Sequence, residues 1–121
     1  MWKVAIFDDN QVVVDALCRS IDWKSMNCSI CGVASNGTDA LAVINNAQPN
    51  IVITDILMPG FSGLELAAMV KKTHQSTKFI IITGFSNAKF ARQSVRLSVF
   101  DYISKPVDNE EIVKVVLEAI D

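Results

Sequence analysis

The strongest constraint on the fold of this chain is an alternation of short apolar runs and helix-length segments, repeated five times. Such an alternation predicts a parallel sheet, because each strand is followed by a right-handed crossover that returns to the same sheet. Strands that are buried on both faces read as continuous apolar runs, as these do. We therefore predict an α/β fold, a doubly wound sheet with helices on both faces. The predicted strands cover residues 3–7, 28–34, 51–54, 79–83 and 101–104, and the predicted helices cover residues 11–20, 37–45, 62–72, 88–96 and 108–120.

Local signals support several helix starts. Ser62 with Glu65, and Asp108 with Glu111, have the spacing of a capping box, in which side chains satisfy the first free amides of a helix. Asn36-Gly37 predicts the turn into the second helix.

Apolar residues at helical spacing predict which helix faces are buried. The first helix is expected to bury Val13, Ala16, Leu17 and Ile21, and the third is expected to bury Leu64, Ala67 and Ala68. Trp23 is expected to fill the gap between the first helix and the second strand.

Size and composition predict one soluble domain. A chain of 121 residues can build one two-sided core and leaves no room for a second. No apolar stretch reaches the roughly 20 residues of a membrane span, and the chain starts in a strand pattern without the layout of a signal peptide, so a cytoplasmic location is expected. The net charge of −2 offers no basic face for nucleic acid. We therefore expect no direct nucleic-acid binding.

The three cysteines are not expected to form a disulfide framework or a metal site. Their number is odd, which argues against a closed set of disulfides. Cys28 and Cys31 form a C-x-x-C, but they lie in a predicted strand, where residues three apart face opposite sides. Free thiols fit a reducing compartment.

Charged residues follow three of the predicted strands at one edge of the sheet. Asp8 and Asp9 follow the first strand, Asp55 follows the third, and Lys105 with Pro106 follows the fifth. Because ligands of open parallel sheets bind outside the carboxyl ends of the strands, we expect these clusters to line one crevice. Crowded carboxylates need a cation, and their hard oxygens suit Mg²⁺. The lysine beside them predicts an anion, most simply a phosphoryl group.

At these residues the chain resembles the receiver domain of two-component response regulators, the CheY-like family. The segments that carry the resemblance are Asp8-Asp9, Ile53-Thr54-Asp55-Ile56-Leu57-Met58-Pro59-Gly60, Thr83-Gly84 and Asp101-Tyr102-Ile103-Ser104-Lys105-Pro106. The resemblance implies a flavodoxin-like (βα)5 fold with strand order 2-1-3-4-5, whose switch point lies between the first and third strands. Ile21-Asp22-Trp23 and Lys105-Pro106-Val107-Asp108 further resemble receivers that precede AraC-type DNA-binding domains.

The resemblance implies a role for each residue of the crevice. Asp55 is expected to be the nucleophile that accepts a phosphoryl group from a sensor histidine kinase. Lys105 and the hydroxyl of Thr83 would bind phosphoryl oxygens, and the bond before Pro106 would be cis. The expected ligands of Mg²⁺, or of Mn²⁺ in its place, are Asp8, Asp9, Asp55 and the backbone carbonyl of Leu57.

Thr83 and Tyr102 resemble the switch pair of the family. Capture of the Thr83 hydroxyl by phosphate is expected to let the ring of Tyr102 turn inward and to change the face formed by the fourth helix, fifth strand and fifth helix. A phosphorylation-dependent homodimer is possible on this face. The candidate contact residues are Phe100, Tyr102, Lys89 and Arg92. Residues 1–121 would form only the receiver, with an AraC-type output domain beyond them in the full-length protein.

Two other functions are compatible with the same residues. The chain could be a stand-alone receiver that acts through protein contacts, although intact Asp9, Asp55, Thr83 and Lys105 argue against a degraded one. It could also be a small Mg²⁺-dependent aspartyl phosphatase, but such an enzyme needs a second acid for the leaving group and usually a covering cap. We therefore interpret the chain as a phosphoaccepting switch, not an enzyme, whose site catalyses its own phosphorylation and dephosphorylation.

Overall fold

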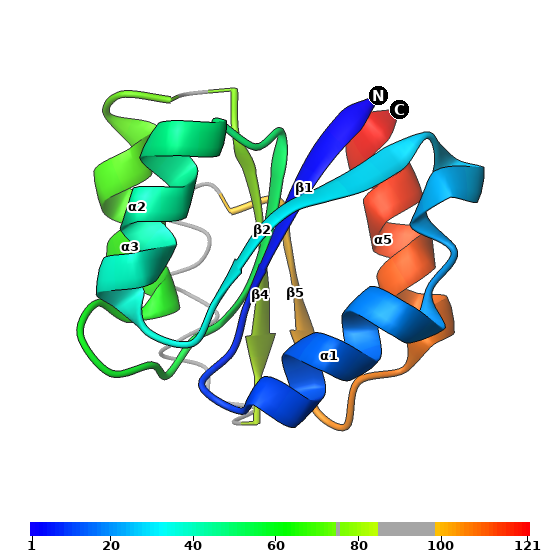
Figure 1. Cartoon of the computed structure of the whole chain (residues 1–121), viewed down its shortest axis with the longest axis horizontal. Coiled ribbons are helices and arrows are strands. Elements are labelled where there is room, and N and C mark those ends of the chain that lie inside the picture. The colour runs from blue at the N-terminus through cyan, green and yellow to red at the C-terminus, as the bar shows by residue number, and fades with distance from the viewer. Residues whose placement is uncertain (75, 85–98) are drawn as a thin grey trace.

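The chain folds into a five-stranded parallel sheet between two layers of helices (Figure 1). The computed structural model describes residues 1–74, 76–84 and 99–121. The strand order is β2-β1-β3-β4-β5, and all neighbouring strands are parallel. The strands are β1 (Trp2–Phe7), β2 (Cys28–Ala34), β3 (Ile51–Asp55), β4 (Lys78–Thr83) and β5 (Asp101–Ser104). The described helices are α1 (Gln11–Ser20), the short 3-10 helix η1 (Trp23–Met26), α2 (Gly37–Ala47), α3 (Gly63–Lys71) and α5 (Asn109–Ile120).

This architecture confirms the predicted fold class and strand order. Helix α1 and strands β2 and β5 have the predicted bounds, and the ends of the other predicted elements that are described differ by one or two residues. Ser62 and Asp108, predicted as first helical residues, are N-caps. The helix η1 was not predicted, because four residues are too few for a periodic pattern. The helix predicted for residues 88–96 lies outside the described residues.

Two hydrophobic clusters, one on each face of the sheet, form the core. Helices α1 and α5 cover one face, and α2 and α3 cover the other (Figure 1). Val4 and Ile6 of β1 belong to the cluster under α1 and α5, whereas Ala5 and Phe7 belong to the cluster under α2 and α3. All four are fully buried. The uninterrupted apolar run of β1 therefore reflects two buried faces.

The buried face of α1 differs in part from the predicted one. Val14 and Leu17 are buried, whereas Val13 is half-buried and Ala16 is exposed. Val13 and Val14 are adjacent and equally apolar, so the sequence does not show which of them faces the sheet. Trp23 is buried as predicted, and its indole N–H donates a hydrogen bond to the carbonyl of Leu17 at 3.1 Å.

The buried face of α3 is wider than predicted. Leu66 and Val70 are buried together with the predicted Leu64 and Ala67, while Ala68 is only half-buried. Helix α3 is apolar on most of its circumference, and its orientation on the sheet decides which side is most enclosed.

One of the two predicted capping boxes is present. The hydroxyl of Ser62 accepts a hydrogen bond from the amide of Glu65, and the carboxylate of Glu65 accepts one from the amide of Ser62, both at 3.1 Å. At α5 the cap is Asp108, as expected, but its carboxylate accepts the amide of Glu110 at 3.0 Å instead of that of Glu111.

Two glycines let the loop between β3 and α3 lie close to its neighbours. A Cβ atom on Gly37 would lie 2.2 Å from the backbone nitrogen of Phe61, and a Cβ atom on Gly63 would lie 2.4 Å from the carbonyl oxygen of Asp55. The amide of Gly37 also donates to the carbonyl of Pro59 at 2.8 Å. The loop is thereby held between the start of α2 and the end of β3.

The cysteines are arranged as the strand pattern predicts. Cys28 packs in the cluster under α1 and α5, whereas Cys31 packs against the cluster under α2 and α3. Both thiols are free, as is that of Cys18. The C-x-x-C pair therefore faces two sides of the sheet.

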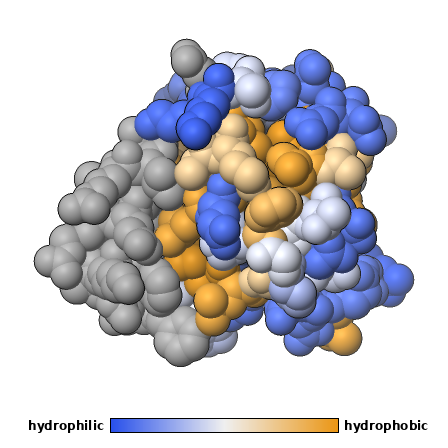
Figure 2. All heavy atoms as spheres, turned by 90° about the vertical axis from the view of Figure 1, so that its left-hand side faces the viewer, coloured by the Kyte–Doolittle hydropathy of each residue, from blue (hydrophilic) through white to orange (hydrophobic). Residues whose placement is uncertain are grey.

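The described surface over α2 and α3 mixes hydrophobic and hydrophilic residues (Figure 2). Half-buried hydrophobic residues packed against the cluster beneath it include Leu41, Val43, Phe61 and Met69. Within the described parts of the chain, the helices are too short or too polar to cross a bilayer.

Candidate functional site

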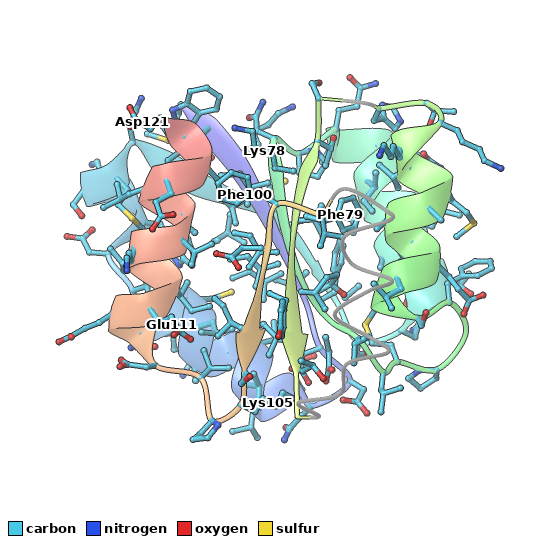
Figure 3. The ribbon with its side chains drawn as sticks, turned by 180° about the vertical axis from the view of Figure 1, so that it is seen from behind. Lys78, Phe79, Phe100, Lys105, Glu111 and Asp121 are labelled. Carbon is cyan, nitrogen blue, oxygen red and sulfur yellow. The ribbon has the colours of Figure 1, made fainter. Side chains whose placement is uncertain are left out.

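The carboxyl ends of four strands bring the predicted site residues to one edge of the sheet. Asp8 follows β1, Asp55 ends β3, Thr83 ends β4 and Lys105 follows β5. The amide of Lys105 donates to the carbonyl of Thr83 at 2.8 Å, which extends the pairing of β4 and β5 to the site. Figure 3 shows Lys105 at this edge, while Lys78 lies toward the opposite one.

Three carboxylates lie within reach of one cation. One oxygen each of Asp8, Asp9 and Asp55 lies within 4.8 Å of the other two. Asp8 and Asp55 are only 1% and 5% exposed, whereas Asp9 is exposed. The cluster therefore has two acids in its interior and one at its solvent side.

The ammonium group of Lys105 contacts both buried acids. Its Nζ donates a hydrogen bond to Oδ2 of Asp55 at 2.9 Å. It lies 3.4 Å from Oδ2 of Asp8, an ion pair without hydrogen-bond geometry. The bond between Lys105 and Pro106 is cis. Three carboxylates face one ammonium, so the cluster keeps an excess of negative charge.

The pKa values of two groups reflect this excess. Burial raises the pKa of Asp8 above its ordinary value, and the charge of Asp55 raises it further. Two contacts oppose the shift: the amide of Asn10, which donates to Oδ1 of Asp8 at 2.9 Å, and the charge of Lys105. Burial acts to lower the pKa of Lys105, but the hydrogen bond and charge of Asp55 and the charge of Asp8 outweigh it and raise that pKa. The raised pKa of Lys105 therefore reflects the surrounding negative charge, whereas the raised pKa of Asp8 reflects mainly its burial.

The oxygen atoms of the cluster fit a hard divalent cation. Among the described residues, the buried Oδ2 atom of Asp8 accepts no hydrogen bond. Leaving a buried acceptor unsatisfied costs free energy, which a bound cation would offset. Oδ1 of Asp55 accepts a long hydrogen bond of 3.2 Å from the amide of Leu57. Carboxylate and carbonyl oxygens are the ligands that Mg²⁺ prefers, so Asp8, Asp9 and Asp55 are the groups that would hold it. The backbone carbonyl of Leu57 stays a predicted further ligand.

The two residues predicted to form a switch lie on neighbouring strands and differ in burial. Thr83 is 1% exposed at the end of β4, whereas Tyr102 of β5 is 42% exposed. The ring of Tyr102 is therefore on the outside of the molecule.

Two of the four candidate contact residues lie in the described part of the chain. Phe100 is 37% exposed, and Nζ of Lys78 lies 5.2 Å from the centroid of its ring, a cation–π contact. Tyr102 is similarly exposed. Lys89 and Arg92 lie outside the described residues.

Two features of the site were not predicted from the sequence. A hollow of about 310 Å³ lies next to Lys105 and is lined by Val13, Ala16, Leu17, Lys105, Pro106, Val107 and Asn109. It arises where α1 packs against the loop after β5, and no local pattern encodes that packing. The second feature is the buried hydroxyl of Thr54, which donates to the carbonyl oxygen of Asp55 at 3.0 Å. A polar residue inside an apolar strand was the available signal.

Comparison with known proteins assigns the chain to a family. Residues 4–117 match the response regulator receiver domain. The chain belongs to this family, which confirms the resemblance seen in its motifs. Receiver domains are the phosphoacceptor switches of two-component response regulators; they bind Mg²⁺ in an acidic pocket and interact with histidine kinases and output domains.

Relatives include transcriptional regulators and their receiver domains. The uncharacterised transcriptional regulatory protein YesN of Bacillus subtilis is 36% identical over 120 residues, which are 99% of this chain and 33% of YesN. The chain thus spans about a third of the length of that relative. A DNA-binding response regulator of the LuxR family from Staphylococcus aureus has a TM-score of 0.91 at 31% identity, with 100% of both chains covered. A two-component transcriptional regulator AraC from Clostridium phytofermentans has a TM-score of 0.90 at 26% identity, with 99% of this chain and 93% of the other covered.

Proposed function

We propose that Asp55 accepts a phosphoryl group from a sensor histidine kinase in a Mg²⁺-dependent reaction, and that this reaction switches the surface of the domain. The observation that carries the proposal is the position of the Asp55 carboxylate, which lies among the acid oxygens and 2.9 Å from the ammonium of Lys105. An anionic nucleophile can approach an anionic phosphoryl group only where positive charge offsets their repulsion. Membership of the receiver family supports the same role.

Asp55 acts as the nucleophile in this proposal. One of its carboxylate oxygens attacks the phosphorus of a phosphohistidine, the P–N bond breaks, and an acyl phosphate forms on Asp55. Asp8, Asp9 and Asp55 would hold a Mg²⁺ ion, which would supply positive charge against the repulsion of the reacting anions. The amide of Leu57, bonded to Oδ1 of Asp55, limits the rotation of the carboxylate.

Lys105 and Thr83 connect phosphorylation to a change of shape. The ammonium of Lys105 leaves the Asp55 carboxylate and pairs with a phosphoryl oxygen, and the hydroxyl of Thr83 donates to another. These contacts exist only in the phosphorylated protein, so they favour a second conformation by their differential binding energy. In that conformation the exposed ring of Tyr102 turns inward and alters the face that includes β5 and α5.

Labelling with a small phosphodonor tests the assignment. Acetyl phosphate with Mg²⁺ is expected to add one phosphoryl group, detected by intact mass, and Asp55→Asn should abolish it. Asp15→Asn, a matched change at an exposed acid of α1, should leave labelling intact. Undiminished labelling of Asp55→Asn, or labelling of the parent without any divalent metal, would contradict the proposal.

The same preparation separates a switch from an aspartyl phosphatase. A switch holds its phosphoryl group and releases it slowly to water. A phosphatase would release many equivalents of phosphate per chain from an added phosphate monoester. Continuous turnover of such a monoester would favour the enzyme.

We further propose that the receiver controls transcription through an attached AraC-type DNA-binding domain. YesN, a transcriptional regulator, is about three times as long as the matched region, and the AraC regulator from Clostridium phytofermentans has the same fold. The segments Ile21-Asp22-Trp23 and Lys105-Pro106-Val107-Asp108, which resemble receivers that precede AraC-type domains, support this class. Sequencing of the complete reading frame tests this proposal, and an output domain of another class would overturn it.

A further inference from the structure

A buried hydroxyl lies immediately before the predicted phosphoacceptor. Thr54 of β3 is 0% exposed, and the residues before it in the strand, Val52 and Ile53, are apolar and equally buried. Strand alternation places Thr54 on the same face as Val52, in the cluster under α2 and α3. A hydroxyl at such a position costs free energy unless it is bonded, so its partners indicate what it does.

The Thr54 hydroxyl contacts Asp55 and Met58, the first and last residues of the turn after β3. Its Oγ1 atom donates to the carbonyl oxygen of Asp55 at 3.0 Å and lies 3.9 Å from the sulfur of Met58. The carbonyl is the stronger acceptor, and the thioether is a weak one. Met58 is nearly buried, with 9% of its surface exposed. The hydroxyl therefore ties the main chain of Asp55 to the side chain three residues further on.

The Asp55 carbonyl has little freedom to move elsewhere. The Cα atom of Gly63 approaches it so closely that an added Cβ would lie 2.4 Å from the oxygen. The next residue, Ile56, donates its amide to the carbonyl of Ile82 at 2.9 Å and accepts the amide of Gly63 at 3.0 Å. The turn after β3 is thus held from three directions: by Thr54, by the start of α3 and by β4.

Leu57 lies in the middle of this turn and connects the turn to the Asp55 carboxylate. Its side chain is 48% exposed, while its amide donates to Oδ1 of Asp55 at 3.2 Å. A side chain that is about half exposed restrains its residue less than a buried one would, so the direction of the Leu57 amide and carbonyl depends strongly on the neighbouring main chain.

We propose that Thr54 is a positioning residue that acts through the main chain of residues 55–58, orienting the Leu57 amide toward the Asp55 carboxylate and the Leu57 carbonyl toward the cation. This inference rests on the proposed function for its consequence in phosphorylation. The part that concerns the direction of the Leu57 amide applies to the metal-free protein and does not depend on phosphorylation.

The test compares Thr54→Val, which removes the hydroxyl at similar size, with Thr54→Ser, which retains it. Thr77→Val is the matched control, because the Thr77 hydroxyl also donates to a carbonyl, that of Pro49, at 3.0 Å but at the start of β4. The first readout is the amide chemical shift of Leu57 in ¹H–¹⁵N spectra of the metal-free proteins. The second is the dissociation constant of Mg²⁺, titrated alone. The third is the rate of labelling with acetyl phosphate.

Thr54→Val is expected to shift the Leu57 amide toward a weaker hydrogen bond and to weaken Mg²⁺ binding by about tenfold, the lower end of the effect of residues that orient metal ligands. Labelling should slow accordingly. Thr54→Ser should keep all three readouts near those of the parent, and Thr77→Val should match the parent. If Thr54→Val does not fold, Thr54→Ala against Thr54→Ser gives the same comparison, since the two differ only in the hydroxyl.

The outcomes for the two proposals are distinct. A folded Thr54→Val protein with the Leu57 shift and Mg²⁺ affinity of the parent would overturn the positioning role. An equal loss in Thr54→Ser and Thr54→Val would overturn it too, because packing and not the hydroxyl would then be responsible. Failure of the parent to be labelled would overturn the proposed function, whereas the Leu57 shift would still decide the role of Thr54.

Discussion

At the scale of single residues, the charge of Asp8 lowers the stability of the metal-free protein but favours cation binding. Its carboxylate is buried, and one oxygen accepts no hydrogen bond from the described residues. Burial and the charge of Asp55 raise its pKa. The charge that Asp8 carries at neutral pH therefore costs folding free energy in the metal-free protein, while it adds an oxygen ligand for a cation.

Asp8→Asn is expected to raise the free energy of unfolding of the metal-free protein by about 1 kcal/mol at neutral pH, because a buried charge is removed. A carboxyl whose pKa is raised by folding stabilises the protein below its unfolded pKa and loses that contribution as the pH rises through the folded pKa. The advantage of the variant should therefore shrink as the pH falls from neutral toward the ordinary value of 3.8. Urea unfolding across this range measures it. Mg²⁺ should stabilise the parent more than the variant, and a variant that is less stable at neutral pH would refute the argument.

Leu57 is expected to prolong the life of the phosphorylated state. Its exposed apolar side chain lies two residues after Asp55 and cannot orient an attacking water by hydrogen bonding. Phe85, the corresponding residue after Thr83, lies outside the described residues. Leu57→Asn should hasten phosphate loss on the order of tenfold, a small part of what positioned proton transfer can contribute. Decay of the labelled protein by intact mass measures the rate, with Leu57→Met as the apolar control. Unchanged or slower decay would count against this role.

At the scale of elements, β5 connects the crevice to the outer face. Lys105 follows the strand and pairs with Asp55, while Tyr102 within the strand is exposed. The bond from the Lys105 amide to the carbonyl of Thr83 links the end of β5 to that of β4. A movement of Lys105 toward a phosphoryl oxygen would therefore act on both strands.

Lys105→Ala is expected to permit slow labelling of Asp55 but to uncouple it from the change at Tyr102, because the phosphoryl charge loses its differential partner. The ring chemical shifts of Tyr102 before and after labelling measure the coupling. Lys114→Ala, at an exposed lysine of α5, is the control. If labelled Lys105→Ala shifts Tyr102 as the parent does, Lys105 does not transmit the change.

At the scale of the whole molecule, both β5 and α5 carry exposed hydrophobic residues. Phe100 before β5, Tyr102 within it and Leu117 of α5 are 37%, 42% and 48% exposed. We expect beryllofluoride with Mg²⁺ to shift the chain from monomer to dimer in sedimentation experiments, because activation, as proposed above, would alter the face that includes β5 and α5. An attached output domain would then gain effective concentration on neighbouring DNA half-sites.

Phe100→Ala and Leu117→Ala should weaken the activated dimer. Val33→Ala is the control, since Val33 is 42% exposed but lies on β2 at the other edge of the sheet. A strictly monomeric activated chain would remove the dimer mechanism. Gel shifts should show no DNA binding by residues 1–121, whose net charge is −2; salt-sensitive binding would contradict this.

Prediction from sequence succeeded where local chemistry and burial agree. Strand β1 was recognisable because both of its faces are core, and the start of α3 because Ser62 and Glu65 cap it reciprocally. It failed where two neighbouring residues are equally apolar, as at Val13 and Val14, because only the orientation of the helix on the sheet selects one. The hollow beside Lys105 was not predicted for the same reason.

For the site, the sequence by itself determined which charges exist and that each follows a strand, so their common edge follows from the parallel fold. Only the tertiary structure decided how they pair. Lys105 and Asp55 are fifty residues apart in the chain yet 2.9 Å apart in space, and the Asp8 oxygen beside them is left without a hydrogen bond from the described residues. Such distances depend on how strands and loops pack over the whole sheet, to which every buried side chain contributes, and no local pattern contains that information.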